Sequence, residues 1–355
     1  MMNNRYDRHN LIPDWRQEAL ADATVVVMGM GALGNEATRI LAMTGAGKLI
    51  ICDPDRVEDS NLSRTLLFRR SDIGRFKVEA AAEALERLAP GLIVQPRPQP
   101  LVHGVGMAEL RDATIVLGCL DSRSARLQLA GRCQMARAAY IDGATHPWGG
   151  EVRPYLNPDG PCYGCSLSVE ERAVVDAPWS CLDVIPETAV GAAAPSSALV
   201  GTWMGMIAVR FLMGLPCPPG ALSIDASRGT TIIVKQERDP ECPLHHPLGA
   251  VARLNLGSQD TAGQMRRSLP ADAVPLLWEP AQERVECPQC GFSEERWALP
   301  SLAECPQCGH TLRPRTTLEL DQAPYDLKLS DLGIAPREIL AVRTQDGLLW
   351  VELAE

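Results

Sequence analysis

Two basic residues, Arg64 and Lys77, follow closely behind two acidic residues, Asp53 and Asp55, in the first third of the chain. Asn61 lies between the two pairs. Carboxylates suit the hydroxyl groups of a ribose, whereas arginine and lysine neutralise phosphate oxygens. The spacing therefore predicts a site for an anionic ligand. The alternative is that Arg64 and Lys77 are ordinary charges on a solvated surface.

A glycine-rich turn precedes these charges. Gly29, Gly31 and Gly34 form a GxGxxG pattern after an apolar run and before a helical pattern. Such glycines permit a tight turn and close backbone approach, and the helix N-terminus offers N–H groups to an anion. Asp53 ends the next predicted strand and suits ribose hydroxyls. The pattern indicates a nucleotide but does not distinguish NAD from ATP, and a turn that merely packs a helix on a strand is the alternative.

Strands and helices alternate through the first 145 residues. Buried strands are predicted where β-branched residues run together, and helices where apolar residues recur at helical spacing. The predicted strands are 25–27, 49–52, 92–98, 113–121 and 138–145, and the predicted helices include 72–88 and 122–137. This alternation is typical of an α/β fold with a doubly wound sheet, which binds ligands at the carboxyl ends of its strands.

The pattern changes after residue 149. Antiparallel strands are predicted at 149–157, 221–226 and 230–238, around an apolar helix at 198–214. Further along, we expect a linker at 247–282, a small four-cysteine unit at 283–312, and a β-rich segment at 313–355. Residues 1–246 would then form the main domain, in which a crossover loop spans about 166–197.

Seven separated motifs occur in one order over about residues 1 to 245, and together they carry a resemblance to a known family. The motifs are RYDRH, GMGALG, DPDRVEDSNLSR, DIGRFK, CLDSRSAR, PCYGC, and an apolar helix before CPLH. In these features the chain resembles the ThiF/MoeB/ubiquitin-activating enzyme superfamily of adenylyltransferases. The resemblance implies a Rossmann-like sheet with a mixed continuation, to which this chain adds a C-terminal zinc ribbon and a β-rich tail.

The resemblance also implies a reaction. These enzymes adenylate the C-terminal carboxylate of a small ubiquitin-like protein with ATP and release pyrophosphate, a chemistry that depends on positioning and charge neutralisation. Arg64 and Lys77 would hold the phosphates, and Asp121 would hold Mg²⁺. The remaining implied roles are Asp53 and Asp55 near the ribose, Asn61 ordering the loop, and Arg126 anchoring the loop around Asp121.

Arg8 matches the second arginine of the family's RYxRQ start. In relatives this arginine reaches the ATP site of the partner subunit, so the resemblance implies a homodimer. His9 and Thr65 stand where relatives usually carry glutamine.

Two cysteine groups have the spacing of zinc sites, so with the absence of a secretory pattern we favour metal over disulfides. The family places a structural zinc at the positions of Cys162, Cys165, Cys242 and His245, usually with four cysteines. His246 is an alternative fourth ligand. The alternative to a zinc site is a reduced thiol pair without metal. The second group repeats Cys-Pro-Gln-Cys-Gly and predicts a zinc ribbon whose folding depends on metal. Its ligands would be Cys287, Cys290, Cys305 and Cys308.

Cys181 lies in the expected crossover loop, where many relatives carry a catalytic cysteine. The resemblance implies that its thiolate attacks the acyl-adenylate to form a thioester. An unused structural thiol is the alternative.

Composition limits the remaining classes. The formal net charge of −10 disfavours a nucleic-acid binder. Neither a signal-peptide pattern nor a run of eighteen apolar residues occurs, so we expect a cytoplasmic protein without a membrane span.

Four functions account for parts of this sequence. The first is an activating enzyme for a ubiquitin-like protein, with ATP, Mg²⁺, two structural Zn²⁺ ions and a conjugating enzyme as partner. The second is a sulfur-carrier adenylyltransferase without a thioester. A non-catalytic, zinc-stabilised binding module would not need Arg64, Lys77 and Asp121, and an NAD-dependent dehydrogenase would leave the basic pair without a role.

Overall fold

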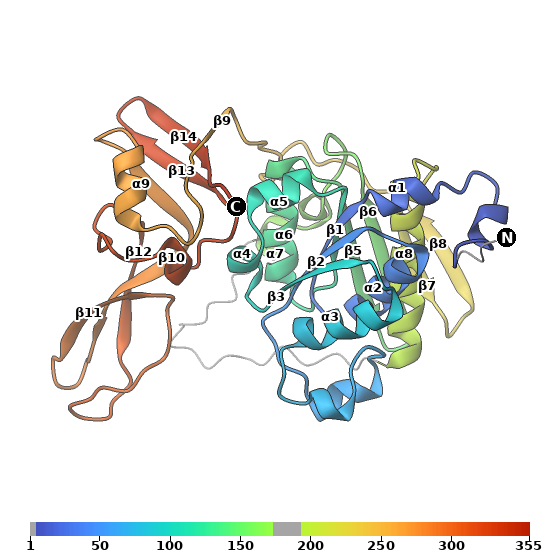
Figure 1. Ribbon diagram of the computed structural model, residues 1–355, viewed down its shortest axis with the longest axis horizontal. Coiled ribbons are helices and arrows are strands. Elements are labelled where there is room, and N and C mark those ends of the chain that lie inside the picture. The colour runs from blue at the N-terminus through green and yellow to red at the C-terminus, as the bar shows by residue number, and fades with distance from the viewer. Residues whose placement is uncertain (1–4, 173–192) are drawn as a thin grey trace. The chain divides into compact units, whose positions relative to one another are not determined.

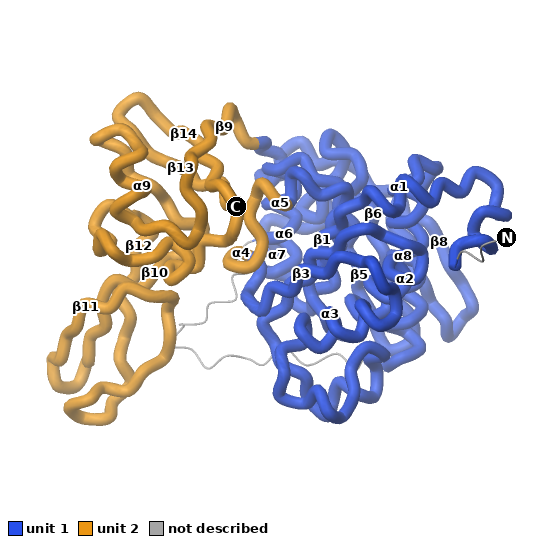
Figure 2. The backbone as a smooth tube through the Cα atoms, viewed as in Figure 1, with its two compact units in different colours: residues 1–101, 110–247 blue, residues 102–109, 248–355 orange. Residues whose placement is uncertain are grey.

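The computed structural model describes residues 5–172 and 193–355. The chain forms two compact units (Figure 2): residues 1–101 with 110–247, and residues 102–109 with 248–355. None of the helices in the described parts of the chain combines the length and the apolar character that crossing a membrane requires.

The first unit contains an eight-stranded sheet in the order β3-β2-β1-β4-β5-β6-β7-β8 (Figure 1). The strands from β3 to β5 are parallel, and each later pair is antiparallel. This order confirms the predicted doubly wound sheet with a mixed continuation. The strands are β1 Thr24–Met28, β2 Lys48–Cys52, β3 Ile93–Arg97, β4 Ile115–Gly118, β5 Tyr140–His146, β6 Gly149–Tyr155, β7 Ala221–Asp225 and β8 Thr230–Val234.

Both faces of the parallel strands are buried. Val25 and Val27 of β1 belong to the main core cluster, whereas their neighbours Val26 and Met28 point to the other face and are equally buried. Because side chains alternate between two buried faces, these strands are almost continuously apolar.

The helices of the unit are α1 Gln17–Ala21, α2 Ala32–Thr44, α3 Lys77–Leu88, α6 Arg123–Ala136, α7 Val169–Arg172 and α8 Ala194–Leu212. Two short helices, α4 Leu101–Gly104 and α5 Met107–Asp112, each contain residues of both units.

Two helix boundaries differ from the sequence expectation. The helix expected from residue 72 begins at Lys77, because residues 70–72 form a separate 3-10 turn, η3 Arg70–Asp72, and Gly74 then takes a positive φ of 89°. The apolar helix expected from residue 198 begins at Ala194, with Pro195 in its first turn, where proline is well tolerated.

The second unit contains a six-stranded sheet in the order β11-β10-β13-β14-β9, with β12 paired to β10. Its elements are β9 Val251–Arg253, α9 Ala262–Ser268, β10 Val274–Glu286, β11 Ser293–Ala298, β12 Arg313–Glu319, a 3-10 turn η5 Leu329–Leu332, β13 Ile339–Thr344 and β14 Gly347–Glu352. The expected linker at 247–282 is therefore wrong: it contains β9, α9 and most of β10. Its apolar residues Ala262, Met265 and Leu277 are buried in the core of this unit. The short helix α9 places few of its residues in the core, so the segment is rich in polar residues and glycine. That composition led to the linker prediction.

Residues 102–109 lie between β3 and β4 in the sequence but belong to the second unit. His103 Nδ1 is 2.7 Å from the carbonyl oxygen of Gly333, and the Met107 amide donates to Glu338 Oε1 at 3.1 Å. Gly106 has no room for a side chain, because a Cβ there would lie 2.1 Å from the carbonyl oxygen of Pro336. The segment is thus an integral part of the second unit.

Candidate nucleotide-binding and metal sites

The three glycines of the GxGxxG turn meet three different surroundings. Gly29 follows β1 with φ +92°, and a Cβ there would lie 2.4 Å from the carbonyl oxygen of Cys119. A Cβ on Gly34 would lie 2.0 Å from the carbonyl oxygen of Gly29. Gly31, the N-cap of α2, has an ordinary φ of −67°, and a Cβ there would meet no atom within 4 Å. The fold therefore requires Gly29 and Gly34 to be glycine but makes no such demand at Gly31.

Asp53 closes this turn from the neighbouring strand. Its Oδ2 accepts the Met30 amide at 2.6 Å, and its Oδ1 accepts the Asp55 amide at 2.8 Å. Burial raises the pKa of Asp53, and the nearby charge of Lys77 opposes that rise. An ionised carboxylate has about four lone-pair sites. Asp53 can therefore accept hydroxyl donors in addition to the two backbone amides.

Lys77 is the first residue of α3, and its ammonium lies 2.6 Å from Asp55 Oδ2. The lysine side chain is only 12% exposed, whereas the Asp55 side chain is 62% exposed. The backbone supports the same pairing, because the Lys77 amide donates to the Asp55 carbonyl at 2.9 Å. The helix start thus fixes a lysine beside the two acidic residues that follow β2.

The loop that carries Arg64 is organised by Asn61. Asn61 lies in the 3-10 turn η2 Asp59–Ser63 and is 8% exposed. Its Oδ1 accepts the Glu58 amide at 3.0 Å, which agrees with the expected ordering role. Arg64 ends the turn, and its Nη1 donates to the Ser60 carbonyl at 2.8 Å.

Asn35 is a residue that the sequence reasoning missed. It is fully buried in α2, donates to the Met30 carbonyl at 2.9 Å, and accepts the Leu67 amide at 3.0 Å. One side chain therefore ties the glycine-rich turn to the loop after Arg64. Only its place immediately after Gly34 could have suggested this role.

Asp121 approaches the turn from β4. Cys119, two residues before it, donates its amide to the Met28 carbonyl at 2.8 Å and packs its own carbonyl against Gly29. The Asp121 side chain is exposed. Arg126 of α6 donates through Nη2 to the Leu120 carbonyl, which agrees with the expected anchoring of this loop.

Arg8, another predicted catalytic residue, is not brought to this site within the described parts of the chain. Arg8 is exposed at the start of the 3-10 turn η1 His9–Leu11, and among the described residues no interaction joins it to the candidates above. Cys181 lies outside the described residues.

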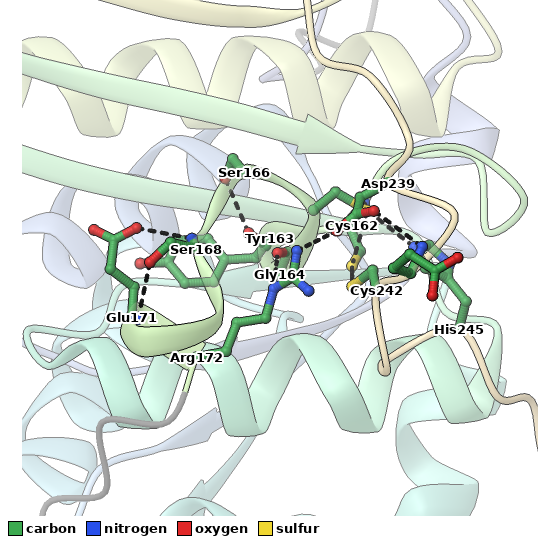
Figure 3. A network of polar contacts seen from close by, with 12 residues as sticks. Cys162, Tyr163, Gly164, Ser166, Ser168, Glu171, Arg172, Asp239, Cys242 and His245 are labelled. Atoms are coloured by element: carbon green, nitrogen blue, oxygen red, sulfur yellow. Dashed lines mark hydrogen bonds and ion pairs between the residues drawn. The ribbon is translucent and has the colours of Figure 1, made fainter.

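The first cysteine group converges as the sequence predicts (Figure 3). Cys162 Sγ lies 3.7 Å from Cys165 Sγ and 3.7 Å from Cys242 Sγ, while Cys165 Sγ lies 3.0 Å from His245 Nε2. Sulfurs bound tetrahedrally to zinc at about 2.3 Å lie roughly 3.8 Å apart. A disulfide would need about 2.05 Å. The four donors therefore fit one zinc ion, with His245 rather than His246 as the fourth ligand.

Arg172 supports this group from α7. Its Nε donates to the Gly164 carbonyl at 2.8 Å, and its Nη2 pairs with Asp239 (Figure 3). The contact joins the turn η4 Tyr163–Ser166 to the segment that supplies Cys242 and His245. The two halves of the ligand set, far apart in sequence, are thus held together by protein contacts as well.

The second cysteine group forms two equivalent turns. Cys287 Sγ is 3.5 Å from Cys308 Sγ, and Cys290 Sγ is 3.6 Å from Cys305 Sγ. Gly291 and Gly309 follow the two pairs with φ +75° and +70°. Around the cysteines, the buried apolar residues of this cluster are Val285 and Leu312, and Phe292 and Ala303 pack against them half-buried. The donor set fits zinc, and so small a core would gain folding free energy from a bound metal.

Comparison with known proteins covers the first unit. The ThiF family model matches residues 5–244. The chain is 32% identical over 245 residues to molybdopterin-synthase adenylyltransferase of Salmonella typhimurium, over 67% of this chain and 94% of that protein. It is 30% identical over 249 residues to the SAMP-activating enzyme E1 of Haloferax volcanii, over 68% of this chain and 88% of that protein.

Solved structures show the same fold. The crystal structure of E. coli MccB with ATP superimposes with a TM-score of 0.57 at 21% identity, over 69% of this chain and 74% of that one. The family match extends over about two thirds of the chain and includes the glycine-rich turn, Asp53, Asp121 and the three cysteines of the first cysteine group. On this evidence the chain belongs to the ThiF family.

Proposed function

We propose that the first unit is an ATP-dependent adenylyltransferase that activates the C-terminal carboxylate of a small carrier protein of the sulfur-carrier type. A carboxylate oxygen would attack the α-phosphorus of ATP, the bond from that phosphorus to the bridging oxygen would break, and pyrophosphate would leave. The names of the relatives support the adenylation step, and two relatives named as sulfur carrier protein adenylyltransferases support a sulfur carrier as substrate.

The observation that carries the proposal is the open space around Gly31. Gly29 and Gly34 are glycines because the fold leaves no room for a side chain there, whereas Gly31 faces open space at the N-terminus of a thirteen-residue helix. The lack of a side chain at Gly31 therefore favours a ligand bound at this position. Backbone N–H groups at a helix N-terminus suit phosphate oxygens, and a glycine lets those oxygens approach closely.

The other residues take roles that match their contacts. Asp53 would accept ribose hydroxyls, and Arg64 would neutralise phosphate charge. Lys77 would exchange its pairing with Asp55 for a phosphate oxygen, and the Asp55 carboxylate, which is already exposed, would then be left to solvent. Asp121 would hold Mg²⁺, which prefers carboxylate oxygens and lowers the charge on the phosphates.

A homodimer is part of the proposal. The edge strand β8 exposes apolar side chains on both of its faces, with Ile232 59% and Ile233 56% exposed. An open apolar edge invites association unless something covers it. We propose that a second copy covers β8 and that Arg8 of each copy completes the site of the other.

A second candidate function adds a thioester on Cys181 and transfer to a conjugating enzyme. The name of the Haloferax relative, an activating enzyme E1, favours it. The relatives named as sulfur carrier protein adenylyltransferases favour the simpler reaction, which we therefore place first.

The test is ATP–pyrophosphate exchange with a panel of purified small carrier proteins that end in a free carboxylate. Lys77→Ala should abolish exchange, whereas Arg70→Ala should not, because Arg70 is an exposed surface partner of Asp59. Absence of exchange with every carrier, while an unrelated adenylyltransferase works in the same assay, would contradict the proposal.

A non-reducing gel separates the two candidates. A thiol-sensitive adduct that disappears in Cys181→Ala and persists in Cys217→Ala would establish the thioester. Exchange without an adduct would leave adenylation as the complete reaction.

A further inference from the structure

Asp142 is a fully buried carboxylate at the centre of a polar cluster in the first unit. It lies on β5, and both of its oxygens are 2.7 Å from Arg126 Nη1. Arg153 Nη1 donates to it at 3.0 Å, and the Tyr140 hydroxyl donates at 2.9 Å. A buried ion pair is weak evidence for stability, because apolar residues of similar volume often do as well. The cluster therefore calls for a role besides packing.

The guanidinium of Arg126 has a second contact that supplies such a role. While Nη1 is held by Asp142, Nη2 donates to the Leu120 carbonyl. That carbonyl shares a rigid peptide plane with the amide nitrogen of Asp121. Holding the carbonyl therefore sets the direction in which Asp121 leaves the end of β4.

Without Asp142, the guanidinium would have no fixed orientation in this cluster. Burial disfavours the charged form of Arg126, but the charge of Asp142, together with smaller contributions from Tyr140 and Tyr163, leaves the pKa of Arg126 raised. Asp142 thus compensates the burial of the Arg126 charge as well as orienting the guanidinium. The planar, five-donor guanidinium can serve the carboxylate and the carbonyl together, which the single ammonium of a lysine cannot do.

The same cluster reaches the first zinc-ligand group. The guanidinium carbon of Arg153 lies 5.7 Å from the centre of the Tyr163 ring, and Tyr163 stands between Cys162 and Cys165. Arg153 is also paired with Glu151 on its own strand. One carboxylate therefore connects the loop of Asp121 with the turn that carries two metal ligands.

We propose that Asp142 is a positioning residue for the nucleotide site: through Arg126 it holds the Leu120–Asp121 peptide, and so aims the Asp121 carboxylate at the Mg²⁺ that accompanies the nucleotide. The inference rests on the proposed function for the identity of the ligand. The anchoring itself depends only on contacts within the chain.

Two variants break the connection at different points. Asp142→Asn keeps the size of the side chain but removes the charge that orients Arg126. Arg126→Lys keeps a positive charge beside Asp142 but removes the donor to the Leu120 carbonyl, so it cuts the anchor and spares the ion pair. Tyr140→Phe and Glu151→Gln remove other contacts of the same cluster and serve as matched controls.

Hydrogen exchange without any ligand tests the anchor. Residues 119–125 should exchange at least tenfold faster in Asp142→Asn and in Arg126→Lys than in the wild type, while β1 and α2 keep their protection. Tyr140→Phe and Glu151→Gln should leave residues 119–125 unchanged. Wild-type protection of residues 119–125 in Arg126→Lys would overturn the proposal, as would equal loss of protection in Tyr140→Phe.

A Mg²⁺ titration of ATP–pyrophosphate exchange tests the consequence. The Mg²⁺ concentration for half-maximal exchange should rise about tenfold in Asp142→Asn and Arg126→Lys, with an unchanged KM for the carrier protein. An unchanged Mg²⁺ requirement in both variants would overturn the proposal even if the anchor loosens. A wild type without any exchange would instead refute the proposed function, and hydrogen exchange would still decide whether Asp142 holds the loop.

Discussion

Gly31 and Gly34 lie in one turn, but the fold requires a glycine only at position 34. Gly34 is closed in by the Gly29 carbonyl, whereas Gly31 faces open space. Serine is a favoured N-cap residue, so Gly31→Ser should change the free energy of unfolding by no more than about 0.5 kcal/mol. It should nevertheless weaken ATP binding at least tenfold, because its side chain occupies the position proposed for phosphate. Thermal unfolding and calorimetric titration with ATP measure the two effects.

Gly34→Ala is the control for this prediction. Its Cβ would meet backbone rather than a flexible side chain, so we expect a loss of about 1–3 kcal/mol in stability. If Gly31→Ser loses as much stability as Gly34→Ala, the glycine at 31 serves the fold and the argument for a ligand there fails.

The sequence predicted those site residues whose roles are local. Glycines after a strand and charges after the next strand are visible in the chain itself. Asn35 and Asp142 were missed because their partners lie in other segments, at Leu67, Arg126 and Arg153. A polar residue in a buried element shows its purpose only when the fold supplies its partners.

The zinc ribbon is an element whose stability comes from its ligands. Its apolar cluster is small: besides two cysteines it has Val285 and Leu312 buried and Phe292 and Ala303 half-buried. Cys290→Ser should reduce the bound zinc from about two ions to one per chain and make the strands β11 and β12 sensitive to protease. Metal analysis and limited proteolysis measure this. Cys217→Ser, outside both groups, should retain both ions; two ions retained in Cys290→Ser would contradict the assignment.

The two edges of the large sheet offer a matched comparison for the dimer. Ile233 is 56% exposed on β8, and Ile93 is 57% exposed on β3 at the opposite edge. Ile233→Lys should shift the protein to monomers in light scattering, because a charge at the proposed interface must be desolvated. Ile93→Lys should leave the association state unchanged. The same association state in both variants would contradict the proposal that β8 forms the dimer interface.

Most elements were predictable because their periodicity is strong, as in the buried run of β1. The start of α3 was not, since residues 72–76 continue the amphipathic pattern of the helix although the backbone turns at Gly74. The linker prediction for residues 247–282 was wrong for another reason. Their few buried residues pack against residues that are distant in sequence, mainly in β13, β14 and the chain between residues 320 and 335.

At the scale of the whole molecule, the second unit includes a segment from an earlier part of the chain, residues 102–109. Met107 and Val105 are at most 1% exposed, and the Met107 amide is bound by Glu338. A chain ended after residue 247 loses these partners, so we expect it to aggregate or to unfold at least 5 °C below the full chain. Light scattering and thermal unfolding test this. A fully stable 1–247 fragment would show that residues 102–109 need no cover.

The placement of residues 102–109 also sets an order of events during synthesis. The contacts of His103 with Gly333 and of Met107 with Glu338 span 230 and 231 residues of sequence. Contacts between such distant residues form late, because a long chain must close before they are made. A nascent chain that stalls after the ThiF-family unit therefore still displays an unsatisfied apolar segment, by which chaperones and proteases can recognise it. The segment is covered only after Gly333 and Glu338 have left the ribosome and closed onto it, so its burial follows the synthesis of the whole zinc ribbon.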